Sequence, residues 1–261
     1  MLVNYNRMMD EKYWDTVAAD YDGEIFSALA NDREGVIASK ICEFSRPKAV
    51  ACDFGCGVGK FLPILSENFH HVYAFDISKE LLDQARDNCK ELDNVTYCKE
   101  DLSKAGLKLQ TIDFALSVNV AIMPSEKIRA AIFKTISKHL CEGGHLLLVV
   151  PSLESALYAD YRLVQWNLKA GLKGAEVISE LAEADGDGSV SLRQGIVDID
   201  DVPTKHHLAE ELEAMFRDRP FNVLSIEKVE YPWNTEFDRP PRWMKEPYPW
   251  DWMVVLQKVK S

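Results

Sequence analysis

The sequence predicts an α/β fold with a mostly parallel, doubly wound sheet, and three observations carry this prediction. Between residues 49 and 150, short apolar stretches alternate with segments of helical apolar spacing. Three glycines, Gly55, Gly57 and Gly59, separate the first apolar stretch from the helix that follows it. Acidic residues follow the first three strands. Alternating β and α segments imply parallel strands with helices on both faces of the sheet.

The first strand and its turn read Val-Ala-Cys-Asp-Phe-Gly-Cys-Gly-Val-Gly-Lys at residues 50–60. Glycines are needed where a backbone turns sharply and lets a ligand approach more closely than a Cβ would allow. The segment 61–65 has helical spacing, and Pro63 is tolerated in a first turn. This context is typical of a nucleotide-binding turn, although a glycine-rich turn can also be purely structural.

Three carboxylates are expected at one edge of the sheet. Asp53 ends the first strand, Asp76 ends the strand at 71–75, and Asp101 follows the strand at 95–98. Asp76 lies 21 positions after Gly55 (76 − 55), which places it to accept both hydroxyls of a ribose. Open α/β sheets bind ligands outside the carboxyl ends of their strands, so this convergence favours a binding site over isolated solvated acids.

The run Asp53-Phe54-Gly55-Cys56-Gly57-Val58-Gly59 resembles the first motif of the class I S-adenosylmethionine-dependent methyltransferases. That motif has the spacing G-x-G-x-G, whereas dinucleotide oxidoreductases more often show G-x-G-x-x-G. The resemblance covers residues 45–150 well and the rest loosely. It implies a Rossmann-like, seven-stranded, mostly parallel sheet with an inserted helical and extended cap between strands 5 and 6. It also implies S-adenosyl-L-methionine as the methyl donor, with no metal.

The resemblance further implies roles for individual residues. The Gly55 to Gly59 backbone would lie against the methionine and ribose part of the cofactor, Asp76 would bind the ribose, and Asp101 with Leu102 would meet the adenine. Aromatic residues ahead of the first strand resemble the helices that fold over the pocket in many small-molecule methyltransferases; they could equally pack on the sheet. The expected cofactor-binding residues are Tyr13, Trp14, Tyr21, Asp53, Gly55, Cys56, Gly57, Asp76, Ile77, Asp101, Leu102 and Asn119.

The chain is expected to form a single domain, 1–261, with four parts. They are N-terminal helices at 1–45, a cofactor-binding core at 46–150, a substrate cap insertion at 151–206 and a C-terminal part of the sheet at 207–261. Within the cap, residues 153–184 have helical spacing, Asp185-Gly-Asp-Gly indicates a turn, and residues 189–201 look extended. A helix at 208–218 and strands at 221–229 and 252–258 resume the sheet.

His206 and His207 are the candidate catalytic residues, because a neutral histidine could take a proton from an acceptor hydroxyl or amine. A histidine pair at the entry to a helix can also have no chemical role. Methyl transfer often needs little beyond holding donor and acceptor in line, so a base is not required. Between the last two strands, four tryptophans offer either a flat wall for an organic substrate or a cover for the sheet edge.

The composition limits the classes of binding partner that the chain is expected to have. A formal net charge of −12 and no run of lysine or arginine argue against nucleic acid, so a small-molecule acceptor is expected. No stretch approaches the roughly 20 apolar residues of a membrane span. The six cysteines suit a reducing, cytoplasmic setting, and Cys52 with Cys56 lacks further nearby cysteines for a metal site.

The leading hypothesis is therefore S-adenosylmethionine-dependent methyl transfer to an oxygen, nitrogen or carbon of a small molecule. An alternative is a non-catalytic S-adenosylmethionine-binding protein that engages a protein partner through the cap. A nicotinamide-dependent oxidoreductase has the wrong glycine spacing. No Asn-Pro-Pro-Tyr or Asp-Pro-Pro-Tyr motif, which would suggest methylation of an adenine or glutamine amino group, occurs in the chain. The acceptor, the regiochemistry, the use of a base, the oligomeric state and the pathway stay open.

Overall fold

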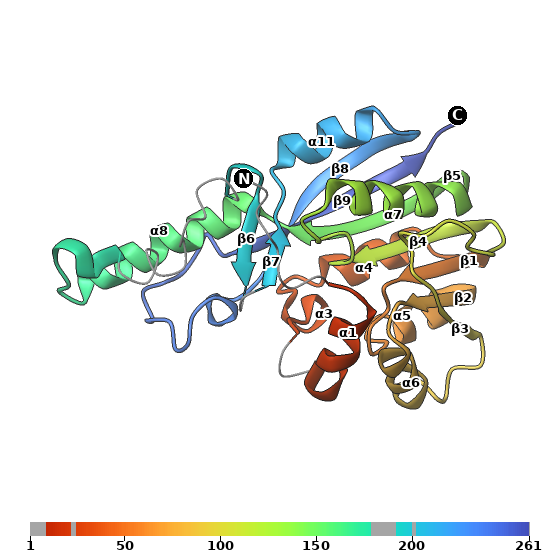
Figure 1. Ribbon diagram of the computed structural model, residues 1–261, viewed down its shortest axis with the longest axis horizontal. Coiled ribbons are helices and arrows are strands. Elements are labelled where there is room, and N and C mark those ends of the chain that lie inside the picture. The colour runs from red at the N-terminus through yellow and green to blue at the C-terminus, as the bar shows by residue number, and fades with distance from the viewer. Residues whose placement is uncertain (1–8, 22–24, 179–191, 200–201, 261) are drawn as a thin grey trace.

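The computed structural model describes residues 9–21, 25–178, 192–199 and 202–260. Figure 1 shows one large sheet with helices on both sides and a long helix projecting away from it. The helices are α1 (Glu11–Val17), η1 (Ala18–Asp20), α3 (Ala28–Asn31), α4 (Val36–Glu43), α5 (Leu62–Asn68), α6 (Lys79–Asn88), α7 (Glu126–His139), α8 (Leu153–Lys169), η2 (Gly174–Ile178), α11 (Ala209–Arg217) and η3 (Trp233–Thr235). The strands are β1 (Arg46–Phe54), β2 (Phe69–Asp76), β3 (Val95–Lys99), β4 (Ile112–Val118), β5 (Leu140–Pro151), β6 (Ile196–Ile199), β7 (Val202–Lys205), β8 (Phe221–Glu230) and β9 (Trp250–Lys258).

The main sheet has seven strands in the order β3-β2-β1-β4-β5-β9-β8. The first five strands in this order pair in parallel, and β9 runs antiparallel between β5 and β8. The predicted α/β, mostly parallel, seven-stranded sheet is confirmed. The chain leaves β1 toward β2 and β3 and later returns to place β4 on the other side of β1. Such a switch point opens a crevice at the carboxyl ends of the strands.

Both faces of the sheet are buried. Along β1, Ala51 belongs to one apolar cluster and Cys52 to the other, and Phe114 and Ala115 divide in the same way along β4. Successive strand residues point to opposite faces, so this division is expected of strands covered on two sides. Residues of α4, α5 and α6 complete the first cluster, whereas residues of α7 and α11 complete the second. The sheet is therefore doubly wound, as predicted.

The segment between β5 and α11 differs in detail from the expectation. The helix expected over 153–184 ends at Lys169, and the short η2 follows within the described residues. The stretch expected to be extended over 189–201 contributes the strand β6, which pairs with β7 in a separate two-stranded sheet. The Asp185-Gly-Asp-Gly turn lies outside the described residues.

Helix α8 projects from the end of β5, and the chain that joins β8 to β9 runs beside it (Figure 1). Ala159 of α8 packs against Trp233 and Met244 of that connection, with Trp166 and Trp243 at the border of the cluster. These tryptophans are thus explained by packing around α8, because their rings give a projecting helix an apolar support. Of the two sequence interpretations, the covering role fits them.

Candidate active site

A cavity of about 1130 Å³ opens at the carboxyl ends of the parallel strands. Its lining comes from the segment around α1, from the turns after β1, β2 and β4, and from the β6–β7 sheet and the β8–β9 connection. Ligand pockets of proteins typically measure about 300–1,000 Å³. The cavity is thus large enough for two small ligands side by side.

The glycine turn forms one wall of this cavity. Gly55 and Gly57 both have positive φ, +79° and +52°. A Cβ at Gly57 would lie 2.5 Å from the hydroxyl oxygen of Tyr21. A side chain is therefore excluded at Gly57 by backbone conformation and by space, and Tyr21 lies directly over the turn. Cys56, between the two glycines, is buried and also lines the cavity.

Asp76 braces the glycine turn from the end of β2. One carboxylate oxygen, Oδ2, accepts a hydrogen bond from the backbone N–H of Gly57 at 2.9 Å, and Oδ1 accepts one from the N–H of Ser78 at 2.9 Å. Burial raises the pKa of Asp76, and these backbone donors partly oppose the rise. Asp76 and the next residue, Ile77, both line the cavity. Asp76 therefore combines a structural role with a position at the site.

Asp53 lies at the end of β1 with only 2% of its surface exposed. Its Oδ2 atom is buried and has no hydrogen-bond partner among the described residues. Burial, and secondarily the charge of Asp76, raises the pKa of Asp53 to about 8. An unpartnered buried carboxyl oxygen is costly, so this residue marks a place where a ligand donor is missing.

The third carboxylate, Asp101, follows β3 and lines the cavity with Leu102. Its Oδ1 accepts hydrogen bonds from the backbone N–H and the hydroxyl of Ser103 at 3.0 and 2.6 Å. Burial raises its pKa, but Ser103 and the ammonium of Lys104 outweigh that effect, so the pKa of Asp101 is lowered. Asp101 is therefore ionised at neutral pH beside a buried apolar side chain.

The N-terminal aromatic residues line the cavity and also pack on the core. Tyr13, Trp14 and Tyr21 all belong to the lining, and Trp14 and Tyr21 pack around the buried side chains of Val58 and Leu81. The structure thus combines the two sequence interpretations, since the segment both covers the cavity and rests on the sheet's helices.

The far end of the cavity contains a polar group from β9 and its neighbours. Asp251, the second residue of β9, accepts a hydrogen bond at Oδ2 from the Tyr231 hydroxyl at 3.0 Å. The side-chain amide of Asn119, which follows β4 with φ +55°, donates to the same oxygen at 3.5 Å. Burial raises the pKa of Asp251 to about 6. Asn119 therefore joins the β4 end of the site to this acidic group.

Comparisons with known proteins relate the stretch that contains the glycine turn to methyltransferases. A family model described as a methyltransferase domain matches residues 51–144, the stretch that runs from the glycine turn to β5. Residues 51–144 are therefore similar to a methyltransferase domain. A magnesium-protoporphyrin O-methyltransferase of Synechocystis sp. (strain ATCC 27184 / PCC 6803 / Kazusa) is 29% identical over 104 residues, which cover 38% of this chain and 44% of that protein. The match thus spans less than half of that relative's length.

Solved structures share the fold of this chain at low identity. A S-adenosylmethionine-dependent methyltransferase of Methanosarcina mazei has a TM-score of 0.59 at 18% identity, covering 85% of this chain and 98% of its own. The magnesium protoporphyrin IX methyltransferase of Synechocystis with bound S-adenosylhomocysteine has a TM-score of 0.57 at 14% identity, covering 95% and 97%. The N-methyltransferase NodS of Bradyrhizobium japonicum, also with S-adenosylhomocysteine, has a TM-score of 0.55 at 11% identity, covering 96% and 98%.

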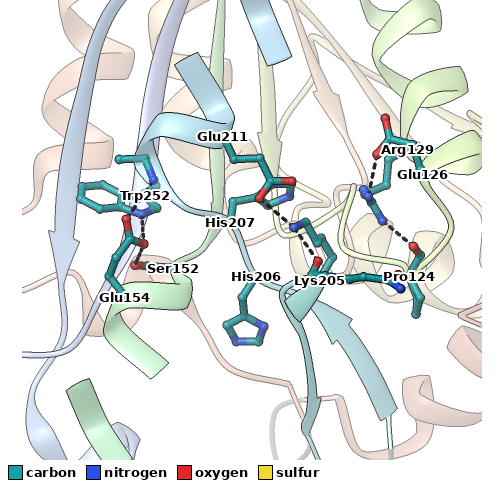
Figure 2. A network of polar contacts seen from close by, with 12 residues as sticks. Pro124, Glu126, Arg129, Ser152, Glu154, Lys205, His206, His207, Glu211 and Trp252 are labelled. Atoms are coloured by element: carbon teal, nitrogen blue, oxygen red, sulfur yellow. Dashed lines mark hydrogen bonds and ion pairs between the residues drawn. The ribbon is translucent and has the colours of Figure 1, made fainter. Parts of the chain in front are cut away.

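The two candidate histidines, His206 and His207, lie in different surroundings. Figure 2 shows the His206 ring pointing away from the group formed by His207, Glu211 and Lys205. His206 lines the cavity, and its Nδ1 lies 3.0 Å from the carbonyl oxygen of Thr204. Burial lowers the pKa of His206 to about 4, so the ring is neutral at pH 7, and Nδ1 donates to the carbonyl while Nε2 keeps its lone pair.

His207 is completely buried and does not line the cavity. Its Nδ1 lies 3.7 Å from Oε1 of Glu211, and Glu211 in turn pairs with the ammonium of Lys205 at 2.8 Å (Figure 2). His207 therefore belongs to a network that joins β7 to α11 and has no access to an acceptor. Of the pair, only His206 remains a candidate for acid–base chemistry.

The cavity lining also includes Tyr231, Glu236 and Asp251, which the sequence did not single out as individual site residues. No motif marks these residues. They lie in or beside the stretch between the last two strands, where prolines and tryptophans dominate the sequence pattern. Of the four tryptophans in that stretch, Trp250 lines the cavity, whereas Trp233, Trp243 and Trp252 do not.

The described residues contain neither a metal-ligand cluster nor a membrane-spanning helix. No cluster of three or more histidine, cysteine, aspartate or glutamate side chains there could hold a metal ion. In the same residues, no helix combines the length and the apolar character needed to cross a membrane.

Proposed function

We propose that the protein transfers a methyl group from S-adenosyl-L-methionine to a small molecule bound in the same cavity. The observation that carries the proposal is the continuity of this cavity. It runs from the glycine turn, Asp76 and Asp101 at one end to Asn119 and Asp251 at the other. Donor and acceptor could therefore lie in contact without crossing solvent.

The residues at the first end fit the cofactor. A carboxylate has about four lone-pair sites, and the described donors to Asp76 are backbone N–H groups, so capacity remains for ribose hydroxyls. The unpartnered Oδ2 of Asp53 offers a hydrogen-bond partner to the ammonium group of the ligand. Leu102 provides apolar contact for the adenine next to Asp101. Tyr13, Trp14, Ile77 and Asn119 would complete this binding site.

The bound cofactor supplies an electrophilic methyl group on a sulfonium. The protein then has to position the acceptor and exclude water, and these two tasks account for much of the catalysis of a displacement reaction. The β6–β7 sheet contributes Ile199, Val202 and Thr204 to the wall on the acceptor side. We therefore keep residues 151–206 as the proposed substrate cap, with His206 as the neutral base if the acceptor must lose a proton.

The setting of this activity is proposed to be the cytoplasm. All six cysteines are free, and three of them are half-buried or exposed. Free thiols in these positions persist in a reducing compartment.

S-adenosylmethionine and S-adenosylhomocysteine are expected to bind with micromolar dissociation constants, whereas NAD is not expected to bind. The reason is the Gly55-Gly57-Gly59 spacing, which differs from the G-x-G-x-x-G of dinucleotide-binding turns, together with the acids that follow it. Isothermal titration calorimetry with the three ligands at equal concentrations measures this. Tighter binding of NAD would refute the cofactor assignment.

A further inference from the structure

We propose that the methyl acceptor is an amine with an apolar body, and that Asp251 and Glu236 bind its ammonium group. This inference rests on the proposed function, because it concerns the occupant of the acceptor end of the same cavity. Four observations carry it: the sign of the charges there, an open oxygen on a buried carboxylate, a second carboxyl nearby, and aromatic walls.

The charged lining of the acceptor end has one sign. Glu236 and Asp251 both line the cavity there. The cavity lining within the described residues contains a single lysine or arginine, Lys60, which belongs to the glycine turn at the cofactor end. An anionic acceptor would have to leave water for a wall with two carboxyl groups and no cation to meet it, which is unfavourable.

Asp251 has an oxygen without a donor. Tyr231 and Asn119 both donate to Oδ2, and no hydrogen bond to Oδ1 occurs among the described residues. The residue is only 9% exposed, and its backbone is held in the sheet between Val229 and Pro151. Oδ1 is not one of the buried unpartnered atoms of the described residues, so it is reached from the cavity that Asp251 lines. The open Oδ1 at the cavity wall therefore calls for a donor from a ligand, and a charged donor satisfies it best.

Glu236 adds a second carboxyl to the same end. It follows η3, and the hydroxyl of Thr235 donates to its Oε1 at 3.1 Å. The Glu236 side chain is exposed at the cavity wall, and its negative charge contributes to the raised pKa of Asp251. A cation placed between the two carboxyl groups relieves this repulsion. An ammonium has three N–H donors, enough for both groups.

The surrounding side chains define the rest of the acceptor. The rings of Tyr231 and Trp250 line the cavity beside the carboxyl groups, and aromatic faces attract cations. Ile199 and Val202 provide apolar wall opposite the sheet. A small charged group would leave these apolar surfaces without contact, so the geometry fits an amine attached to an aromatic or aliphatic body.

The same arrangement serves the reaction. For this acceptor Asp251, rather than His206, serves as the base: the ammonium first gives one proton to the Asp251 carboxylate, which frees the nitrogen lone pair. Methyl transfer then forms a nitrogen–carbon bond and breaks the sulfur–carbon bond of the donor, whose electron pair stays on sulfur as a neutral thioether. The methylated nitrogen carries the positive charge, and Glu236 remains as its counter-ion.

Three compounds of one shape test this assignment: phenethylamine, the neutral 2-phenylethanol and the anionic phenylacetate. Each is titrated by calorimetry into the wild-type protein saturated with S-adenosylhomocysteine. We expect phenethylamine to bind and phenylacetate not to bind, with the alcohol at least tenfold weaker than the amine. Asp251→Asn and Glu236→Gln should each weaken phenethylamine binding tenfold or more, because each removes a charged partner. Both variants should keep the wild-type affinity for S-adenosylhomocysteine within about twofold.

The matched control is Asp238→Asn, which removes one negative charge from a side chain that is 85% exposed two residues beyond Glu236. This variant should bind phenethylamine as the wild type does. Phenylacetate binding as tightly as the amine, no binding of the amine, or equal losses in the control and in Glu236→Gln would each overturn the assignment. Glu236→Gln decides the question if Asp251→Asn does not fold. A failure of the proposed function is distinct, because it would appear as lost S-adenosylhomocysteine binding in the wild type.

Discussion

Replacing Asp76 by alanine is expected to weaken S-adenosylmethionine binding by tenfold to a hundredfold and to lower the melting temperature as well. Charge-assisted hydrogen bonds are worth about 1.5–3 kcal/mol each, and about 1.4 kcal/mol corresponds to a factor of ten in the dissociation constant. The carboxylate also accepts the backbone N–H groups of Gly57 and Ser78, which would lose their partner. Calorimetry gives the affinity, and thermal unfolding gives the stability.

A matched control separates these two effects. Asp83→Asn removes an acid from the exposed surface of α6, where it pairs with Lys79 and Arg86. It should leave the affinity for S-adenosylmethionine unchanged, because exposed ion pairs contribute little. Asp76→Ala could instead lower the melting temperature and keep the dissociation constant within about twofold. Asp76 would then only support the start of α6 and the glycine turn, and it would not be a cofactor-binding residue.

Asp53→Asn is expected to stabilise the protein at high pH and to lose this advantage in acid. Burial raises the folded-state pKa of Asp53 to about 8 from 3.8, so the folded state holds this proton more tightly than the unfolded state does. The stability that depends on the proton is fully present below about pH 3.8 and is lost progressively as the pH rises to about 8. Each pKa unit corresponds to about 1.4 kcal/mol. Asparagine does not titrate and avoids this loss.

Urea unfolding of both proteins without ligand at pH 4 and pH 8.5 measures the effect. The variant should gain stability relative to the wild type at the higher pH and differ little at the lower one. The groups around Asp53 that also carry raised pKa values are Cys52, Cys56 and Asp76; they are present in both proteins, so they contribute to the difference only through their coupling to Asp53. An advantage that is equal at the two pH values would mean that Asp53 is not the titrating group.

The cofactor half of the site could be predicted from the sequence because its information is local. A strand, a glycine turn and a helix occupy consecutive residues, and Asp53, Asp76 and Asp101 each lie at or just beyond the end of a strand. Parallel strands that alternate with helices bring those ends to one edge whatever the details of packing. The seven-stranded sheet was predicted from the same alternation of strands and helices together with the family resemblance.

The acceptor half could not be predicted because it depends on long-range pairing. Asp251 reaches the cavity only because β9 enters the sheet antiparallel to β5, which places Asp251 opposite Pro151. No spacing rule connects residues 100 positions apart in the chain (251 − 151). The histidine pair shows the same difficulty: a bridge from Ser152 to His207 sets which ring faces the cavity. Trp233 was one of the tryptophans considered for the acceptor wall, but it packs on α8. An apolar side chain in a sequence does not indicate which surface it covers.

The most direct test of the central claim is a crystal structure of the protein with S-adenosylhomocysteine bound. The account predicts that the ribose hydroxyls contact Asp76, that the adenine lies against Leu102 beside Asp101, and that the sulfur faces the cavity end lined by Asn119 and Asp251. An adenosine group bound away from Asp76, or a sulfur that faces bulk solvent instead of that cavity end, would contradict a methyl transfer within one continuous cavity.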